Sequence, residues 1–362
     1  MLHDQAPVAR TATPELALVC RFPALAGLPR HALTVLPTPV ERLDRLARRR
    51  GLDPLWIKRD DLTCLLYGGN KPRKLELLLG AALARGRRRV LTFGALGTHH
   101  GLATTICARA AGLDTTLVLV PQPVTPHVQR CLGLLHACGA ELHLASGVAD
   151  AARQALAILA RGWLRSDPPE IIPTGGSSVL GALGYVNAGL ELSEQVRAGL
   201  LPEPAAIFVP LGSGGTVAGL LAGLRAGGLA SRVVAVLVTD IMPPSAGRLL
   251  RMARACLARL DRVARGAAVT AGDLVVERGF IGGGYGASTP EGEEAIQLAR
   301  QHEGIALEHT YTAKCLAALL RHGTTPELRG RPLLFWNTFS SVEPGVAPSP
   351  PDSLPLPFRR FL

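Results

Sequence analysis

The sequence predicts an α/β protein of two three-layer αβα domains built on mostly parallel, twisted sheets. Short apolar runs alternate along the chain with longer stretches whose apolar residues recur at helical spacing. Glycine (40 residues) and proline (28 residues) are spread between these segments as turns. With 48% apolar residues in 362, the chain can bury a large core. Alternating strands and helices of this length favour parallel sheets covered on both faces.

In the first half of the chain, residues 1–35 are expected to be loop-rich, since prolines mark extended segments there. The segment Lys71–Gly86 carries a clear apolar helical stripe that includes Leu75, Leu79 and Ala82. Helices are expected over Val40–Arg50, Lys71–Gly86, Leu102–Ala111, Val124–Cys138, Val148–Trp163 and Gly181–Ala198. Strands are expected over Leu55–Lys58, Val90–Phe93, Thr116–Val120, Glu141–Leu144 and Ile171–Ile172.

The second half repeats the alternation and adds two glycine-rich loops, at Gly212–Gly215 and Gly282–Gly286. Strands are expected over Ala206–Pro210, Val233–Thr239, Ile305–Glu308 and Leu333–Trp336. Helices are expected over Thr216–Ala226, Gly247–Leu260, Pro290–His302 and Ala313–Arg321. The proline-rich stretch Pro344–Pro357 is expected to pack loosely.

The formal charge of +11 does not by itself indicate a nucleic-acid partner. The densest basic runs, Arg48–Arg50 and Arg87–Arg89, end amphipathic stretches, where a helix dipole favours cations. A phosphate-binding patch is the alternative for these runs, but neither is interleaved with aromatic residues. The seven cysteines form no CxxC pair, which favours reduced thiols. With neither a signal peptide nor a membrane-spanning run visible, we expect a cytoplasmic protein without a membrane partner.

Lysine is rare in this chain. Only Lys58, Lys71, Lys74 and Lys314 occur among 39 basic residues, so arginine has taken over the general role of surface cation. A lysine retained against this bias is a candidate for a task that needs an amine able to lose its proton.

The loop from Tyr67 to Lys71 contains two glycines and opens a predicted helix. Glycines before a helix N-terminus let the backbone approach a ligand, and the exposed amides favour an anion. The helix end and the cations Arg73 and Lys74 lower the pKa of an amine at position 71, which imine chemistry needs. An ordinary loop with a solvated lysine fits the spacing equally well.

A second loop, Leu211-Gly212-Ser213-Gly214-Gly215-Thr216, follows a strand and begins a helix. This context predicts a phosphate cradle made of backbone N–H groups and hydroxyls. The loop lacks the Gly-Lys-Ser ending of nucleoside-triphosphate sites and the spacing of the dinucleotide fingerprint. A simple tight turn is the alternative.

Three runs together resemble the D-cysteine desulfhydrase and 1-aminocyclopropane-1-carboxylate (ACC) deaminase family, which uses pyridoxal 5'-phosphate (PLP). The runs are Leu36-Pro37-Thr38-Pro39, Trp56-Ile57-Lys58-Arg59-Asp60-Asp61-Leu62 and Gly68-Gly69-Asn70-Lys71-Pro72-Arg73-Lys74-Leu75-Glu76. Later features keep the family's order: Pro173-Thr174-Gly175-Gly176, Gly212–Thr216, Gly284-Tyr285-Gly286 and Tyr311-Thr312-Ala313-Lys314. The resemblance spans roughly residues 35–340, and its N-terminal motif is highly specific.

The resemblance implies a role for each matching residue. Lys71 would hold PLP covalently and later move the α-proton of the substrate. The residues implied to bind the cofactor are Asn70, Lys71, His99, Ser213, Gly214, Gly215, Thr216 and Thr312. Within this set, Ser213 to Thr216 would hold the phosphate, and Thr312 would meet the ring nitrogen, where the deaminase branch has a carboxylate. The implied catalytic residues are Lys71, Thr98, His99, Tyr285 and Tyr311, although strand-end packing is an alternative for Tyr311.

The resemblance also implies the architecture called PLP-dependent fold type II and a homodimer. A large PLP-binding domain would comprise residues 1–73 and 178–345, with a small domain of residues 74–177 inserted and a tail of residues 346–362. The implied reaction is β-elimination from a small amino acid to a 2-oxo acid and ammonia. The alternatives are ACC-deaminase-type ring opening, a PLP-binding protein with little turnover and, least favoured, a basic nucleic-acid binder.

Two loops depart from the family pattern. His99 stands where the family has an asparagine that contacts the cofactor oxygen, so the imidazole is either a hydrogen-bonding substitute or a new acid/base. The neighbouring pair His99-His100 does not predict a metal site, because adjacent loop residues rarely point to one ion. The segment Asn337–Ser341 replaces a Thr-Gly-Gly run, and Phe339 is expected to reshape the pocket.

Overall fold

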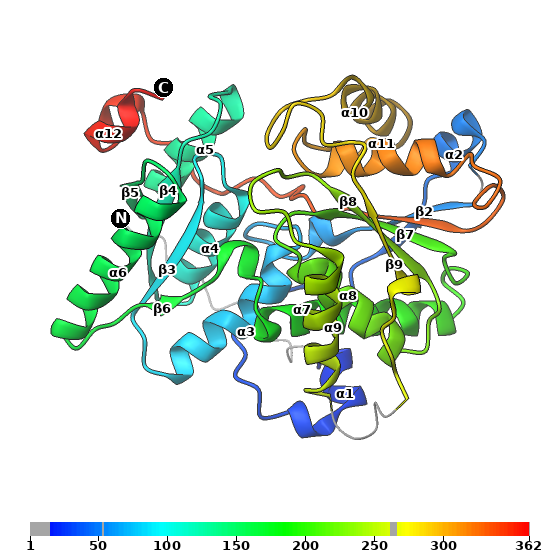
Figure 1. Cartoon of the computed structure of the whole chain (residues 1–362), viewed down its shortest axis with the longest axis horizontal. Coiled ribbons are helices and arrows are strands. Elements are labelled where there is room, and N and C mark those ends of the chain that lie inside the picture. Colours follow the sequence, from blue (N-terminus) through cyan, green and yellow to red (C-terminus); the bar gives the residue numbers. More distant parts are fainter. Residues whose placement is uncertain (1–14, 53, 261–265, 362) are drawn as a thin grey trace, which may run out of the picture.

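Two parallel-stranded sheets form the frame of the protein in a computed structural model, which describes residues 15–52, 54–260 and 266–361 (Figure 1). The larger sheet has the order β1-β2-β10-β7-β8-β9 and the smaller one β5-β4-β3-β6. All neighbouring strands run parallel except β1, which is antiparallel to β2. The strands are β1 (Val40–Arg42), β2 (Leu55–Lys58), β3 (Arg89–Ala95), β4 (Asp114–Val120), β5 (Glu141–Leu144), β6 (Glu170–Ile171), β7 (Ala206–Leu211), β8 (Arg232–Leu237), β9 (Leu274–Glu277) and β10 (Leu333–Trp336).

Helices cover both faces of the larger sheet, as Figure 1 shows. One face packs on α1 (Ala17–Arg21), α7 (Val179–Arg197), α8 (Gly215–Ala226) and α9 (Ala246–Leu257). The other packs on α2 (Asp44–Arg50), α10 (Pro290–Glu303) and α11 (Thr312–His322). The predicted α/β class with mostly parallel sheets is confirmed.

The smaller sheet is covered unequally. Its main core cluster joins it to α3 (Lys71–Ala84), α4 (His99–Ala110) and α5 (Pro126–Ala137). On the opposite face, α6 (Val148–Leu164) buries only Ala151 and Ala155 against the strands. This sheet lies within the segment predicted as the inserted domain, whose boundaries stay a prediction.

Helices α7 and α8 approach each other at backbone distance because glycines line their contact. A Cβ atom on Gly223 would lie 2.3 Å from the carbonyl oxygen of Val186, and one on Gly219 would lie 2.2 Å from that of Ala182. Since real Cβ atoms do not come so near, only glycine allows this packing. The close contact fixes α8, whose N-terminus faces the candidate site described below.

Three predicted segments are wrong. The helix expected over Val40–Arg50 begins only at Asp44, because Val40–Arg42 pairs with β2 as an edge strand. No strand forms over Ile305–Glu308; the edge of the larger sheet is instead β9, which was not predicted. The loop-rich N-terminal prediction misses α1, while residues 1–14 lie outside the described part.

The C-terminal tail packs closely where loose packing was expected. Leu354 and Phe358 are each 1% exposed and join the core cluster of the smaller sheet. The amide of Ser349 donates a 3.0 Å hydrogen bond to the carbonyl oxygen of Gly133 in α5. Two apolar residues among the prolines thus pack the tail against the core of the smaller sheet. In the described part of the chain, no helix has the length and apolar character needed to cross a membrane.

Candidate active site

A cavity of about 750 Å³ lies among the carboxyl ends of strands from both sheets, within the usual size range of ligand pockets. The N-termini of α3, α4 and α8 all contribute to its wall, through Lys71, His99 and Thr216. In open parallel sheets ligands bind at this edge, and convergent helix N-termini favour an anion.

Lys71 is the first residue of α3, and its side chain is partly buried in the cavity wall. Its Nζ donates a 2.5 Å hydrogen bond to Oδ1 of Asn70 and lies 6.0 Å from the ring centre of Tyr311. Burial lowers the pKa of Lys71 to about 8, although the charge of Glu308 opposes the shift. The amine is therefore partly unprotonated near neutral pH, as a nucleophilic lysine requires.

Lys74 is a second buried amine in the same cavity. It is 2% exposed, and its Nζ donates a 3.0 Å hydrogen bond to the carbonyl oxygen of Gly175. Burial and the neighbouring charge of Lys71 hold its pKa well below the ordinary value. Both amines can donate hydrogen bonds to an anion bound at this end of the cavity.

The glycine loop before α8 forms the predicted cradle. Gly214 has a φ of 98° and precedes the first residue of the helix, Gly215, whose amide donates a 3.0 Å hydrogen bond to Oγ of Ser177. The hydroxyls of Ser177 and Ser213 lie 2.7 Å apart. A Cβ atom on Gly215 would come within 2.7 Å of Ser177 Oγ, so a side chain there would fill the cradle.

Asn70 connects the lysine loop with this cradle. Its Nδ2 donates a 3.0 Å hydrogen bond to Oγ1 of Thr216, while its Oδ1 accepts from Lys71. The structure thus brings together Asn70, Lys71 and the Ser213–Thr216 loop, all of which were predicted as cofactor-binding residues.

His99 lines the cavity and carries a buried polar atom without a hydrogen-bond partner among the described residues. Its Nδ1 lies 3.0 Å from the hydroxyl of Tyr67, whereas within the described residues its buried Nε2 has no hydrogen-bond partner. The ring packs on His127, with centroids 4.6 Å apart, and edge-on against Phe339 at 5.3 Å. Burial, His127 and Lys71 hold the pKa of His99 well below its ordinary value, so the ring is neutral.

The two predicted tyrosines meet in the cavity. Their hydroxyl oxygens are 2.8 Å apart, and their rings are in edge-to-face contact at a centroid distance of 6.0 Å. Burial raises the pKa of Tyr285 to about 12 and that of Tyr311 further. Both phenols are therefore protonated at neutral pH, and the pair can donate one hydrogen bond into the cavity.

Thr98 and Thr312 differ in their access to the cavity. Thr98 lines it and caps α4, where its hydroxyl accepts a 3.0 Å hydrogen bond from the amide of Gly101. Thr312 is fully buried, and its hydroxyl donates to the carboxylate of Glu308, a residue that lines the cavity instead. That carboxylate also accepts hydrogen bonds from the amides of Tyr311 and Thr312, so it caps α11.

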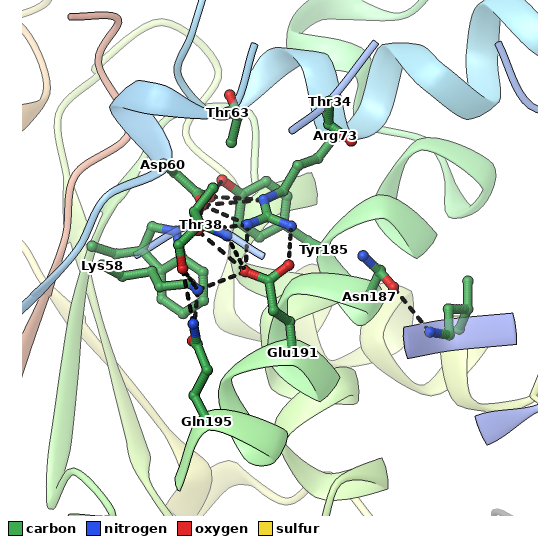
Figure 2. A network of polar contacts seen from close by, with 12 residues as sticks. Thr34, Thr38, Lys58, Asp60, Thr63, Arg73, Tyr185, Asn187, Glu191 and Gln195 are labelled. Atoms are coloured by element: carbon green, nitrogen blue, oxygen red, sulfur yellow. Dashed lines mark hydrogen bonds and ion pairs between the residues drawn. The ribbon is translucent and has the colours of Figure 1, made fainter. Parts of the chain in front are cut away.

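A buried ionic network anchors the beginning of α3 to the larger sheet, as Figure 2 shows. Arg73 Nη2 lies 2.7 Å from Asp60 Oδ1, and Arg73 Nη1 donates to Glu191 at 3.0 Å. Lys58 Nζ donates to the same carboxylate at 2.6 Å. Although burial opposes the shift, Arg73 and Lys58 lower the pKa of Glu191 to about 2. The network holds Arg73, and with it Lys71 one half-turn earlier, in a fixed place.

Two comparisons connect this geometry with known proteins. The sequence pattern of the family described as "Pyridoxal-phosphate dependent enzyme" matches residues 32–338. This chain belongs to the PLP-dependent enzyme family. A D-cysteine desulfhydrase of Klebsiella pneumoniae (strain 342) is 32% identical over 320 residues, which cover 87% of this chain and 94% of the relative. The predicted family, cofactor and PLP-dependent enzyme class are confirmed.

Further relatives show that the family contains more than one chemistry. A nocardicin C-9' epimerase of Nocardia uniformis subsp. tsuyamanensis is 35% identical over 336 residues, which cover 91% of this chain and 99% of the relative. A solved structure described as an ACC deaminase homologue superposes with a TM-score of 0.75 at 31% identity, covering 89% of this chain and 94% of the other. The predicted fold type II architecture is thereby confirmed.

The geometry of the cavity fits PLP. It offers an amine of lowered pKa at Lys71, a glycine cradle at a helix N-terminus for an anion, and an orphaned donor or acceptor at His99 Nε2. Four further residues also line the site: Tyr67, Lys74, Ser177 and Glu308. Of these, only Lys74 was a candidate from the sequence, as one of the four lysines. For the other three residues, only spatial contact reveals the role.

Proposed function

We propose that this chain is a PLP-dependent lyase that removes the α-proton of an amino acid and expels its β-substituent, giving a 2-oxo acid and ammonia. The observation that carries the proposal is the Lys71 amine, which is held at a helix N-terminus with its pKa lowered to about 8. The D-cysteine desulfhydrase relative at 32% identity supports this reaction type. When bound, PLP withdraws electrons from the α-carbon of an amino acid and so makes its proton labile.

Lys71 would be the point of covalent attachment and, once released from it, the base for the α-proton. The phosphate would lie at the α8 N-terminus, held by Ser213, Gly214, Gly215 and Thr216 with help from Ser177 and Lys74. Support comes from the glycine cradle and from the second buried amine beside it. Asn70 would orient the Lys71 amine through the 2.5 Å contact between them.

His99 would act as a neutral donor rather than as a charged acid. If the Tyr67 hydroxyl donates to Nδ1, the proton of the neutral ring is on Nε2, which is buried and has no partner among the described residues. That N–H would meet an oxygen of the cofactor or of the substrate carboxylate, next to the Thr98 end of the site. The hydroxyl of Thr312 now donates a hydrogen bond to the carboxylate of Glu308. It would have to give up this bond before it could contact the ring nitrogen of the cofactor.

The tyrosine pair would return a proton beside His99, whose ring centre lies 6.4 Å from that of Tyr311. One phenol donates to the other, which leaves a single O–H free to protonate or orient the departing group. Ring opening of the ACC-deaminase type would use the same groups and is the alternative reaction. Epimerisation is a second candidate, which the 35% identical epimerase favours, because it also starts with removal of the α-proton.

The decisive experiment is chemical fixation of the cofactor. Protein loaded with PLP, reduced with borohydride and digested should carry the label on the peptide that contains Lys71; Lys58, Lys74 and Lys314 serve as internal controls. Lys71→Arg should abolish the label, while Lys74→Arg should weaken PLP binding but leave the label at Lys71. A label on another lysine, or none, would refute the proposal. Ammonia release from enantiomeric cysteine and ACC then separates elimination from epimerisation, which releases none.

We further propose a cytoplasmic homodimer. The seven cysteines are all free in the structure, which suits a reducing compartment. Leu62, Leu65, Leu66 and Val35 are exposed near one another, since the Val35 amide bonds to Thr63, and such a patch favours a partner surface. A one-chain mass by light scattering would contradict the dimer.

A further inference from the structure

The cavity extends well beyond the polar groups around Lys71, into an apolar lobe formed under α6. All the α6 residues that line the cavity are apolar: Val148, Ala151, Ala152, Ala155, Leu156 and Leu159. Strand residues Phe93, Val118, Val120 and Ile171 complete this lobe. The lobe exists because α6 presents alanines to the sheet, and these small side chains leave space that larger ones would fill.

The entrance to the lobe exposes large apolar side chains on both sides. Val148, Leu156 and Ile171 belong to the smaller sheet and its helix, whereas Ile241 and Met242 follow β8 of the larger sheet. Leu156 is 68% and Met242 69% exposed. Apolar side chains gathered at a cavity mouth mark a ligand-binding surface.

The backbone at Met242 supports a binding role for this mouth. Its φ is 51°, in the left-handed region that a non-glycine residue rarely adopts. Met242 lies in the loop between β8 and α9 and presents an unbranched, adaptable side chain to the cavity. Such local strain concentrates at sites that hold ligands.

We propose that the apolar lobe receives the leaving group of the elimination. The substrate is then a cysteine-like amino acid that carries a bulky apolar group, such as benzyl, on its sulfur. The amino acid end occupies the polar part of the site near Lys71 and Thr98, and the substituent on the β-carbon extends toward Leu156. A substrate as small as free cysteine leaves this apolar surface uncovered. The inference rests on the proposed function, which it makes more specific.

The reaction balances with water alone. The Cα–H and Cβ–S bonds break, the electron pair of the Cβ–S bond leaves on sulfur, and the thiolate takes up a proton. Hydrolysis of the remaining unsaturated amine gives pyruvate and ammonia. S-benzylcysteine and one water thus yield benzyl thiol, pyruvate and ammonia, with no oxidant or reductant.

Binding of unreactive analogues tests the lobe separately from turnover. 2-Amino-5-phenylpentanoate has the shape of S-benzylcysteine but no leaving group, and 2-aminobutanoate keeps only the amino acid core. Both enantiomers of each would be titrated into the PLP-loaded protein by calorimetry. We expect the phenyl compound of the accepted enantiomer to bind roughly tenfold more tightly or better, because it buries apolar area in the lobe.

Two alanines of α6 offer a matched pair of variants. Ala152 and Ala160 are both exposed, but only Ala152 lines the cavity. Ala152→Phe should weaken binding of the phenyl compound roughly tenfold and change 2-aminobutanoate by no more than about twofold, whereas Ala160→Phe should change neither. Release of benzyl thiol from S-benzylcysteine should follow the same pattern.

The outcomes separate the two proposals. Equal affinity for both analogues would overturn the inference and would mean that these side chains serve only to bring the two sheets together. Ala152→Phe acting on both compounds alike, or on neither, would overturn it as well. If these results appear while borohydride still fixes PLP on Lys71, the proposed function stands and only the lobe assignment fails. If PLP is not fixed there, both fail.

Discussion

Two opposing effects set the pKa of the Lys71 amine. Burial removes water from the ammonium and lowers its pKa, while the negative charge of Glu308 partly restores the charged form. The net value of about 8 lies below the ordinary 10.5 of lysine. Because only the unprotonated amine attacks a carbonyl, the pH at which PLP attaches reports this balance directly.

We therefore expect the rate of PLP attachment to cofactor-free protein to rise with pH and to level off above about 9. One pH unit below the pKa, roughly a tenth of the amines are unprotonated, so the rate at pH 7 should be about a tenth of the maximum. Imine absorbance recorded after rapid mixing measures it, with Lys71→Ala as the blank. A rate still rising steeply between pH 10 and 11 would show that burial does not shift the amine.

Individual site residues were predictable when their chemistry was unusual for this chain. Lys71 stood out because arginine replaces lysine almost everywhere, and Ser213–Thr216 because glycines lead into a helix. Tyr67 and Ser177 did not stand out. Their significance comes from contacts with His99 and Ser213, which lie 32 and 36 positions away in the chain. Such pairings arise from the folded geometry, which spacing along one sequence does not encode.

Buried ion pairs attach the N-terminal end of helix α3 to the rest of the protein. Asp60, Glu191, Arg73 and Lys58 are all buried, and each has its counter-charge within hydrogen-bonding distance (Figure 2). Desolvation of such a cluster is costly, and the cost is offset only while each buried charge is paired with an opposite one. Removing one charge leaves the others uncompensated in a medium that solvates them poorly.

Glu191→Gln should accordingly lower the free energy of unfolding by about 3–5 kcal/mol, since Arg73 and Lys58 lose their shared counter-charge. Glu194→Gln, an exposed change one turn further along α7, should stay within about 0.5 kcal/mol. Urea unfolding of the PLP-loaded proteins, followed by circular dichroism, compares them. Similar losses for the two variants would mean that the network does not stabilise the fold.

Whole elements were predicted best where periodicity and burial agree. β2, β5 and β10 have the predicted bounds, and most helices differ only at their ends. The strand predicted over Ile305–Glu308 is wrong because its apolar residues pack as a loop against the core between the larger sheet and α2, α10 and α11. Glu308 instead caps α11. β9 is an edge strand with a partly exposed pattern, so its sequence lacks the continuous apolar run of β7. A pattern of apolar residues does not distinguish a buried loop from a buried strand, and it does not detect a strand that is paired in a sheet but partly exposed.

At the scale of the whole molecule, the C-terminal segment links the two sheets. After β10 the chain leaves the larger sheet, passes the cavity at Phe339 and reaches the smaller sheet, where Leu354 and Phe358 are buried. The tail therefore connects the two sheets on the side away from α6, as the red segment beside α5 in Figure 1 shows. The many prolines in this segment predicted loose packing, so the burial of Leu354 and Phe358 was not expected.

This arrangement predicts that the tail stabilises the protein. Phe358→Ala should lower the free energy of unfolding by about 3–5 kcal/mol, because a fully buried aromatic ring leaves a cavity in the core of the smaller sheet. Leu356→Ala, in the same short helix (α12, Leu356–Arg359) but 77% exposed, should change it by less than about 0.5 kcal/mol. Urea unfolding gives both values, and limited proteolysis should cut the Phe358 variant near Pro350 before any other site. If both variants unfold like the parent protein and the tail is cleaved equally fast in all three, then the tail does not hold the two sheets together, and the smaller sheet owes its place to α3 and α7 alone.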